Sequence, residues 1–421
     1  MVRTFGQGDF QFDNFNNGTR NPTTLVPGTA LFNSSQLSGA GGGYVAVEYL
    51  FIQFAGFTFG KSSSAYSTPW NGFPGNINSS LLGGNNTDTG LNNIQYTAQF
   101  GNGVSASIGL DDPTVWNRTA VYNLGIPSAI GANGTGSNAY AGTHAPDIVG
   151  NIRVDQAWGL FQLSAAAHEV NASYNTLGAG GVPNALSEIS GHPETKWGGS
   201  VMAALNIKNI PTGPGEDIKV DVSYAKGTTK NVIATSGSSP NFAMFGSSGF
   251  GYQSVGFGAT TDGVYMPGAA GTGGIVLTTA WGVRGAFNHN WDPYWSTSLF
   301  GSYSSVRYDG GADDNLLGAG TTSAKGAYCA AFAASHAGQT GVAGVGTYSC
   351  NPDFNVSQLG VVTRWTPVKN LTFSGEVQWF HLDQKMSGSS VFTATAPKPN
   401  ALYEFKDQDT VLLQVRAQRN F

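Results

Sequence analysis

The side chains that could carry out catalysis or bind a metal are few and scattered. Only 11 % of the 421 residues are charged. No serine, histidine and aspartate can be grouped into a nucleophilic centre. The histidines that could ligate a metal show no suitable spacing; they are His168, His192, His289 and His381. The sequence therefore predicts no enzyme, no cofactor and no metal site, and directs attention to charges that act through their electric field.

Six of the 20 lysines and arginines share one feature, which is their position in the predicted strands. Each lies opposite the apolar residues of its strand, so a wet face there would carry a positive field. The long segment 61–92 adds Lys61 at its start and contains one acidic residue, Asp88. The bases on the polar side are Arg3, Arg153, Lys196, Arg284, Arg364 and Arg416.

The strands that must position these residues show a repeated unit. Residues 94–100 alternate between apolar and polar, Gly101-Asn102-Gly103 can turn, and residues 104–110 alternate back. The last twelve residues alternate as well, and they end on the aromatic Phe421. Long segments rich in Gly, Asn, Ser and Thr separate these hairpins. The pattern predicts an all-β, antiparallel sheet with short turns at one rim and long loops at the other.

The alternation predicts about fourteen strands, provided that residues 44–61 are split at Ala55-Gly56. An even number returns the chain end to the rim of short turns, as closure of a barrel requires. The expected strands lie near residues 2–12, 44–54, 57–63, 93–100, 104–112, 147–155, 160–170, 196–206, 217–228, 276–289, 295–308, 355–366, 371–386 and 407–421.

Two features favour a transmembrane β-barrel over a soluble sandwich, which would show the same alternation with its apolar side inside. Aromatic residues recur at strand ends, for example Trp158, Trp281 and Trp365, as interfacial girdles require. The polar sides carry Gln, Ser, Thr and Asn more than Lys and Glu, and the charged fraction is far below the usual ~25 %. No stretch reaches the about 20 apolar residues of a spanning helix. A net charge of −5 gives no reason to expect nucleic acid.

Cys329 and Cys350 are the only cysteines. In an oxidising compartment we expect a disulfide between them, which the loop-entropy model values at about 3 kcal/mol. In a reduced compartment they would remain two free thiols.

Three segments resemble one family of proteins. Phe51-Ile-Gln-Phe-Ala-Gly-Phe-Thr-Phe-Gly-Lys61 is similar to the lead-in to the constriction loop of general porins, above all the alphaproteobacterial (rhizobial and Brucella-type) porins. Cys350-Asn-Pro-Asp353 and the terminal Phe421 are similar as well. The resemblance implies an outer-membrane homotrimer of barrels with about sixteen strands each, surrounded by lipid and lipopolysaccharide and passing small hydrophilic solutes and ions by diffusion.

The resemblance also implies a site. A single barrel domain, residues 1–421, would contain segment 61–92 as an inward-folded constriction loop. Because this loop is the second here and the third in the family, we expect the signal peptide and the first two strands to be missing. We expect a weakly charged constriction with mild anion preference at most. Its residues would be Arg3, Lys61, Asp88 and Arg153, with Lys196, Arg284, Arg364 and Arg416 lining the rest of the pore.

Two alternatives stay open. A substrate-specific uptake channel on the same barrel would show a ladder of aromatic or basic side chains along the lumen, and a secreted β-rich adhesin would show a short internal repeat.

Overall fold

The structure is a computed structural model, and for residues 2–12 and 43–46 only the backbone is described. The residues it describes are 2–12, 43–77, 81–88, 90–114, 119–124, 130–131, 134–136, 138–172, 193–233, 241–247, 253–266, 274–310, 323–336, 348–392 and 401–420.

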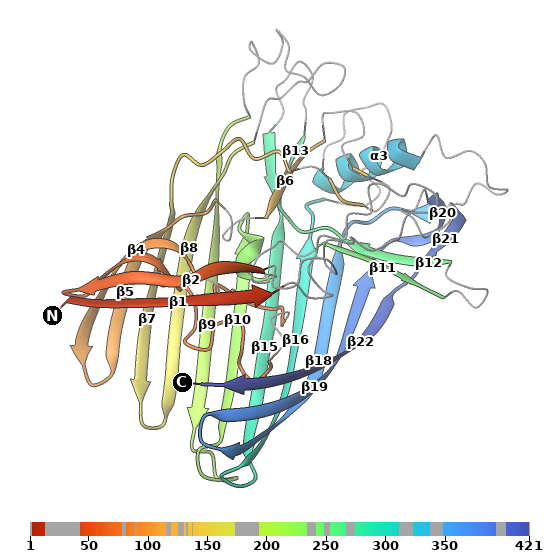
Figure 1. Cartoon of the computed structure of the whole chain (residues 1–421). Helices are drawn as coiled ribbons and strands as arrows, with labels where there is room; N and C mark the ends of the chain where they lie inside the picture. The colour runs from red at the N-terminus through yellow and green to blue at the C-terminus, as the bar shows by residue number, and fades with distance from the viewer. Residues whose placement is uncertain are drawn as a thin grey trace.

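One antiparallel sheet dominates the part of the chain that is described (Figure 1). It has 14 strands, and each follows its neighbour in the sheet in chain order. Short turns join them at one rim and long connections at the other. The strands are β1 (Val2–Phe12), β2 (Gly43–Phe54), β3 (Phe57–Ser62), β4 (Leu91–Gly101), β5 (Val104–Asp111), β7 (Asp147–Gln156), β8 (Gly159–Val170), β9 (Lys196–Lys208), β10 (Asp217–Lys226), β15 (Thr279–Asn290), β16 (Trp295–Arg307), β18 (Phe354–Val368), β19 (Leu371–Gln384) and β22 (Gln408–Arg419).

The short turns lie where glycine and asparagine predict them. Ala55 and Gly56 separate β2 from β3 with φ of 50° and 88°. Asn102 turns β4 into β5 with φ of 50°, a conformation that asparagine tolerates. Gly103 follows with φ of 75°, and a side chain there would collide with the carbonyl of Asp155. The split of residues 44–61 into two strands is therefore confirmed.

The total of about fourteen strands was too low for the whole chain, because the described residues contain 22 strands. The additional strands are short and lie in the Gly-rich connections, where no alternation announces them. They are β6 (Ala120–Asn123), β11 (Phe242–Gly246), β12 (Ser254–Gly258), β13 (Thr261–Met266), β14 (Gly274–Leu277), β17 (Tyr348–Ser349), β20 (Ser387–Phe392) and β21 (Ala401–Phe405).

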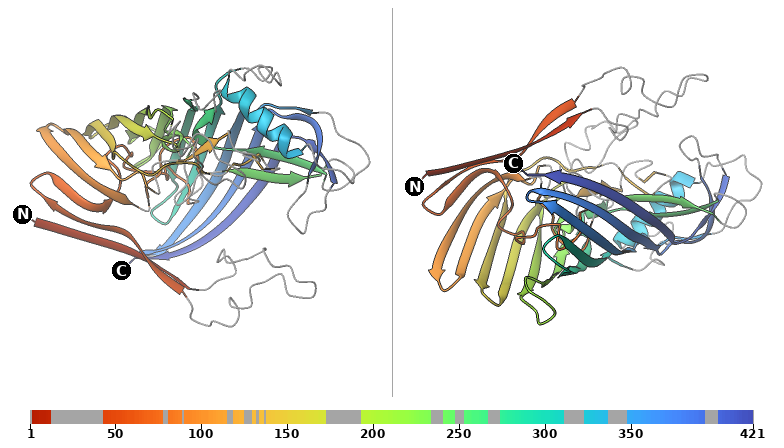
Figure 2. Two further views of the ribbon diagram at one scale, coloured as in Figure 1. Left: turned by 90° about the horizontal axis from the view of Figure 1, so that it is seen from above. Right: turned by 60° about the horizontal axis from the view of Figure 1, so that its bottom comes forward.

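The large sheet is curled, and its two sides differ in polarity (Figure 2). On β10, Asp221 is fully buried while the next residue, Val222, is 50 % exposed. On β19, Glu376 and Gln378 are buried while Val377 and Trp379 are exposed. The buried polar side chains face the concave side, where the connection between β3 and β4 lies. The apolar side chains cover the convex side, which is the reverse of a soluble sandwich.

The curled sheet is open along one line. β1 and β22 stand at the two ends of the strand order, and among the described strands each is hydrogen-bonded to one neighbour only. Both edges lie on the same side of the molecule (Figure 2). The predicted closed barrel is therefore not complete in this structure, because no backbone ladder joins the first strand to the last.

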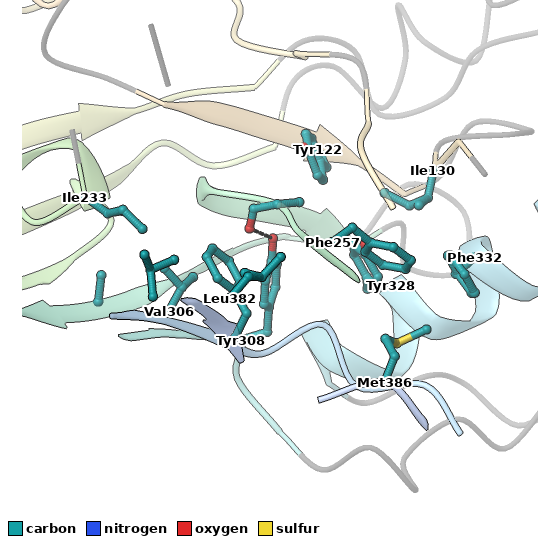
Figure 3. Packing of buried hydrophobic residues seen from close by; sticks show 14 of the residues in the cluster. Tyr122, Ile130, Ile233, Phe257, Val306, Tyr308, Tyr328, Phe332, Leu382 and Met386 are labelled. Carbon is teal, nitrogen blue, oxygen red and sulfur yellow. Dashed lines mark hydrogen bonds between the residues drawn. The ribbon is translucent and has the colours of Figure 1, made fainter. Parts of the chain in front are cut away.

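A second layer, which we call the loop cap, covers the rim of long connections (Figure 1). It contains the sheet β11-β12-β21-β20-β17, the sheet β14-β13-β6 and helix α3 (Ala324–His336). Its core is aromatic and buried, and Phe257, Tyr328 and Phe332 pack there against side chains of the main sheet such as Leu382 (Figure 3). No helix among the described ranges is both long and apolar enough to cross a membrane.

The loop cap contains the predicted disulfide. Cys329 of α3 is bonded to Cys350, and the two Cα atoms lie 5.6 Å apart. Close by, the Lys325 amine donates to Asp353 at 2.7 Å, and the backbone amide of Tyr308 donates to the same carboxylate at 2.9 Å. Helix α3 is thus fixed beside the start of β18 by one disulfide and one ion pair.

Replacing both cysteines by serine is expected to lower the free energy of unfolding of the loop cap by about 3 kcal/mol, because the unfolded segment regains its freedom. Hydrogen exchange measures this, since amides of β20 and β21 should exchange faster while those of β9 and β10 serve as the control. Equal protection of β20 and β21 in both proteins would contradict the prediction.

Candidate functional site

The segment that connects β3 to β4 crosses the concave face of the sheet and is held there mainly through its backbone. Side chains of many strands bind its carbonyl and amide groups. Asn151 donates to the carbonyl of Ala65 at 2.5 Å, and Gln162 donates to that of Ser67 at 2.9 Å. Farther along, the amide of Leu82 donates to Gln358 at 2.8 Å. Contacts of the same kind link Pro74 to Asn288, Gly75 to Arg364, and Ile77 to Glu376.

Apolar contacts add to these hydrogen bonds. Ile77 and Leu81 of the segment are buried against Ala286, Phe300 and Val362, which lie on β15, β16 and β18. Burial of such side chains contributes roughly 1.5–3 kcal/mol each. The segment is therefore a packed part of the fold.

A buried ion pair forms the centre of this attachment. Asp221 of β10 and Arg284 of β15 stand opposite each other in the strand register, and Nε of Arg284 lies 2.9 Å from Oδ1 of Asp221. Both side chains are fully buried. The indole of Trp70 donates to Oδ2 of the same carboxylate at 2.9 Å. Nη2 of Arg284 donates to the carbonyls of Asn71 and Asn85 at 2.7 and 2.6 Å. One guanidinium thus ties together both arms of the segment and two strands.

Glycine permits this close approach. A side chain at Gly84 would collide with the carboxylate of Asp221 and lie 2.8 Å from Cζ of Arg284. The Gly83-Gly84 pair therefore lets the backbone reach the ion pair. Burial raises the pKa of Tyr66, a residue of the segment itself, above its ordinary value, so this phenol stays neutral.

A polar cavity of about 400 Å³ lies between the first half of the segment and strands β4, β5 and β7. Asp88 and Arg153, two of the predicted constriction residues, both line it. Nε of Arg153 donates to Gln162 at 2.9 Å, which orients the guanidinium. The remaining lining residues are Tyr49, Ser63, Ser64, Ala65, Ser67, Thr68, Pro69, Trp70, Asn71, Gln95, Thr97, Gln99, Ser105, Ser107 and Asn151.

Two predicted constriction residues are not placed in this cavity. Lys61 pairs with Leu50 in the strand register and belongs to the side of exposed Phe57 and Phe59, so it lies on the convex side. Its amine donates to the carbonyl of Val47 at 2.5 Å. The prediction erred because the basic residue follows the apolar parity of its strand. Arg3 pairs with Gln53 through the backbone, and its side chain lies outside what the structure describes.

The predicted lining bases occupy three different environments. Lys196 lies near the rim of long connections and is paired with Glu194 at 3.0 Å. Arg284 is buried in the ion pair with Asp221 beneath the inserted segment, and it has no contact with open space. Arg364 and Arg416 share one row across the sheet, since both pair with Ser374 in the register of β18, β19 and β22. Arg364 donates to Ser298 at 2.8 Å, whereas Arg416 is exposed.

Sequence reasoning missed the polar residues that hold the segment. Asp221, Gln358, Glu376, Asn151 and Gln162 all lie on the predicted polar sides of their strands. Their alternation was visible, but the groups that they bind belong to a segment that is 86 to 299 residues away along the chain. Only the path of that segment identifies them.

A separate buried cluster joins the loop cap to strands β7 and β8 of the main sheet. His168 of β8 lies 2.6 Å from Asp147 of β7 through Nδ1 and 3.0 Å from the hydroxyl of Tyr140 through Nε2. That hydroxyl donates to Asp262 of β13 at 2.7 Å. Burial lowers the pKa of the nearby Lys230 to about 8, although Asp262 opposes the shift. Within the described ranges, no group of three or more His, Cys, Asp or Glu side chains is arranged to hold a metal ion.

Comparisons with known proteins agree with this geometry. A model of the Porin subfamily matches residues 1–414. The chain is similar to the outer membrane channel DcaP of Acinetobacter baumannii, with a TM-score of 0.53 and 14 % identity over 99 % of this chain and 81 % of that one. It is also similar to OmpT, an outer membrane protein of Vibrio cholerae, with a TM-score of 0.39 and 7 % identity over 89 % and 80 % of the two chains. No curated protein matches the chain.

Replacement of Arg284 by methionine is expected to destabilise the segment by about 3–5 kcal/mol, because Asp221 then remains as an uncompensated buried charge. Limited proteolysis of the folded protein, with cleavage between residues 63 and 90 as the readout, measures the effect. Arg416→Met is the matched control, since it removes an exposed arginine from the same side of the sheet. Equal cleavage of both variants would contradict an anchoring role for Arg284.

Proposed function

The chain belongs to the Porin subfamily, and from this premise we propose how it acts as a channel of the bacterial outer membrane. It is an outer-membrane porin. In our proposal it lets small hydrophilic solutes and ions diffuse passively through a water-filled lumen. The observation that carries the proposal is the difference between the two faces of the sheet. The concave face is polar and has a segment fixed across it, and the convex face is apolar.

The proposed membrane arrangement follows from the exposed aromatic residues. Trp197, Tyr224, Trp281 and Trp379 lie toward the long connections, and Trp158, Trp295 and Trp365 lie at the short turns. Such rings favour the two interfaces of a bilayer. We place the short turns in the periplasm and the loop cap outside the cell.

A closed wall is part of the proposal. Unpaired backbone groups of β1 and β22 would be costly in lipid, because no water is there to bind them. We propose that these edges are joined or covered in the membrane, as in a sixteen-stranded barrel of the alphaproteobacterial type, and that three such chains assemble as a trimer surrounded by lipopolysaccharide.

The constriction lies, in this proposal, beside the segment between β3 and β4, within the loop of residues 61–92. Arg153 and Asp88 both line its cavity and would set opposing fields on passing ions. We add Arg3 to these residues because of the strand register. Arg3 pairs with Gln53, Gln53 pairs with Thr58, and Thr58 pairs with Gln95, which lines the cavity. Arg364 and Arg416 line the lumen nearer the short turns, and Lys196 lines its outer end. Arg284 contributes by fixing the segment.

In planar bilayers we expect stepwise conductance, in groups of three for a trimer. Arg153→Gln and Arg3→Ala should shift the reversal potential in a salt gradient toward cation preference, and Asp88→Asn should shift it toward anion preference. A unit charge about 7 Å from an ion in water contributes about 0.6 kcal/mol, which is roughly a threefold change in local ion concentration.

Lys208→Gln is the control, because Lys208 is paired with Asp155 at the short-turn rim, away from the cavity. Absence of conductance would refute the channel. Conductance with reversal potentials unchanged in all variants would refute only the assigned constriction.

A further inference from the structure

The polar cavity beside the inserted segment has the chemistry of a binding site. Building on the proposed channel function, we propose that it is a transit site for neutral polyhydroxylated solutes of the saccharide class. Its volume of about 400 Å³ falls within the range of small-molecule sites, which is roughly 300–1,000 Å³.

Both walls of the cavity present groups that can donate and accept hydrogen bonds. The segment contributes serine, threonine and asparagine side chains, and the sheet contributes glutamine, serine and threonine. Hydroxyl and amide groups serve in both roles, as sugar hydroxyls also do. A site selective for anions would offer donors only, and one selective for metal cations would offer acceptors only.

The two charged side chains described in the cavity wall have opposite signs. Among the described lining side chains, Arg153 is the only base and Asp88 is the only acid. An ionic solute would gain from one of them and lose from the other. A neutral solute with many hydroxyl groups can use both, because hydrogen bonds to charged groups are the stronger ones.

One acceptor in the cavity wall lacks a donor among the described residues. Oε1 of Gln95 is buried and makes no hydrogen bond there. A buried acceptor without a donor costs about 1–3 kcal/mol. Gln95 itself lines the cavity, so in our proposal its amide turns toward the cavity and a solute hydroxyl removes that cost. The neighbouring hydroxyls of Thr97 and Ser107 bind each other at 2.9 Å and keep acceptor lone pairs for a solute.

Two aromatic rings complete the lining. Trp70 is fixed by its bond to Asp221, and Tyr49 is bonded to Ser63 at 3.0 Å. Their apolar faces suit the C–H faces of a sugar ring. The binding must remain weak, because a solute in transit has to leave as well as enter.

Current block in planar bilayers tests the proposal, with glucose, maltose and glycine as probes. For the unmodified protein we expect a saturable decrease of the current with glucose or maltose, half-complete in the millimolar range or above. Gln95→Leu should raise the half-blocking concentration about tenfold, since it removes a hydrogen bond of about 1.4 kcal/mol. Gln414→Leu, on the concave side of β22 and outside the cavity, should not change it.

The other outcomes are distinct. A decrease of current that is linear in glucose concentration and equal in the Gln95→Leu variant overturns the transit site and leaves the channel intact. Saturable block by glycine alone, abolished in Arg153→Gln, overturns the saccharide class in favour of zwitterions. A protein that forms no conducting channel at all refutes the proposed function and this inference with it.

Discussion

The two-residue period of the β-strand is the constraint on which this structure depends. Because neighbouring side chains point to opposite sides, one strand can present valine to lipid and aspartate to water in consecutive positions, as Val222 and Asp221 do. The wall of an aqueous channel needs both sides at once. Repetition of this alternation along the sheet produces an apolar exterior and a mainly hydrogen-bonding interior.

The polar interior also explains how a long segment can be fixed inside the sheet. Backbone carbonyl and amide groups that leave water need partners, and the inner wall supplies amides, carboxylates and one guanidinium at the required places. The Asp221–Arg284 pair shows the balance involved. Burial of the two charges is costly, but Trp70 and the carbonyls of Asn71 and Asn85 satisfy most of their remaining valences. The same residues of the sheet thus determine both the chemistry of the concave face and the position of the inserted segment.

The sequence predicted what depends on local pattern. The strand ranges and the turns at Ala55-Gly56 and Asn102 are local, and so is the proximity of Cys329 to Cys350 along the chain. What it did not predict depends on distant segments. The short strands of the loop cap have no alternation of their own. Arg284 carries the parity of a lumen residue, but only the path of the inserted segment reveals that it is buried. Lys61 lies on the convex side although it ends the motif from which the constriction loop was predicted.

The loop cap has a consequence for the order of assembly. Its core draws Tyr122, Phe257, Phe332 and Phe405 from widely separated parts of the chain, and β12 pairs with β21 about 150 residues later. Contacts of such long range form late, because the intervening chain must first be organised. The aromatic core can therefore close only after the strands on both sides of it are in place. The cap would then mark the completion of the sheet, and a chain with an unfinished sheet would leave those aromatic side chains exposed.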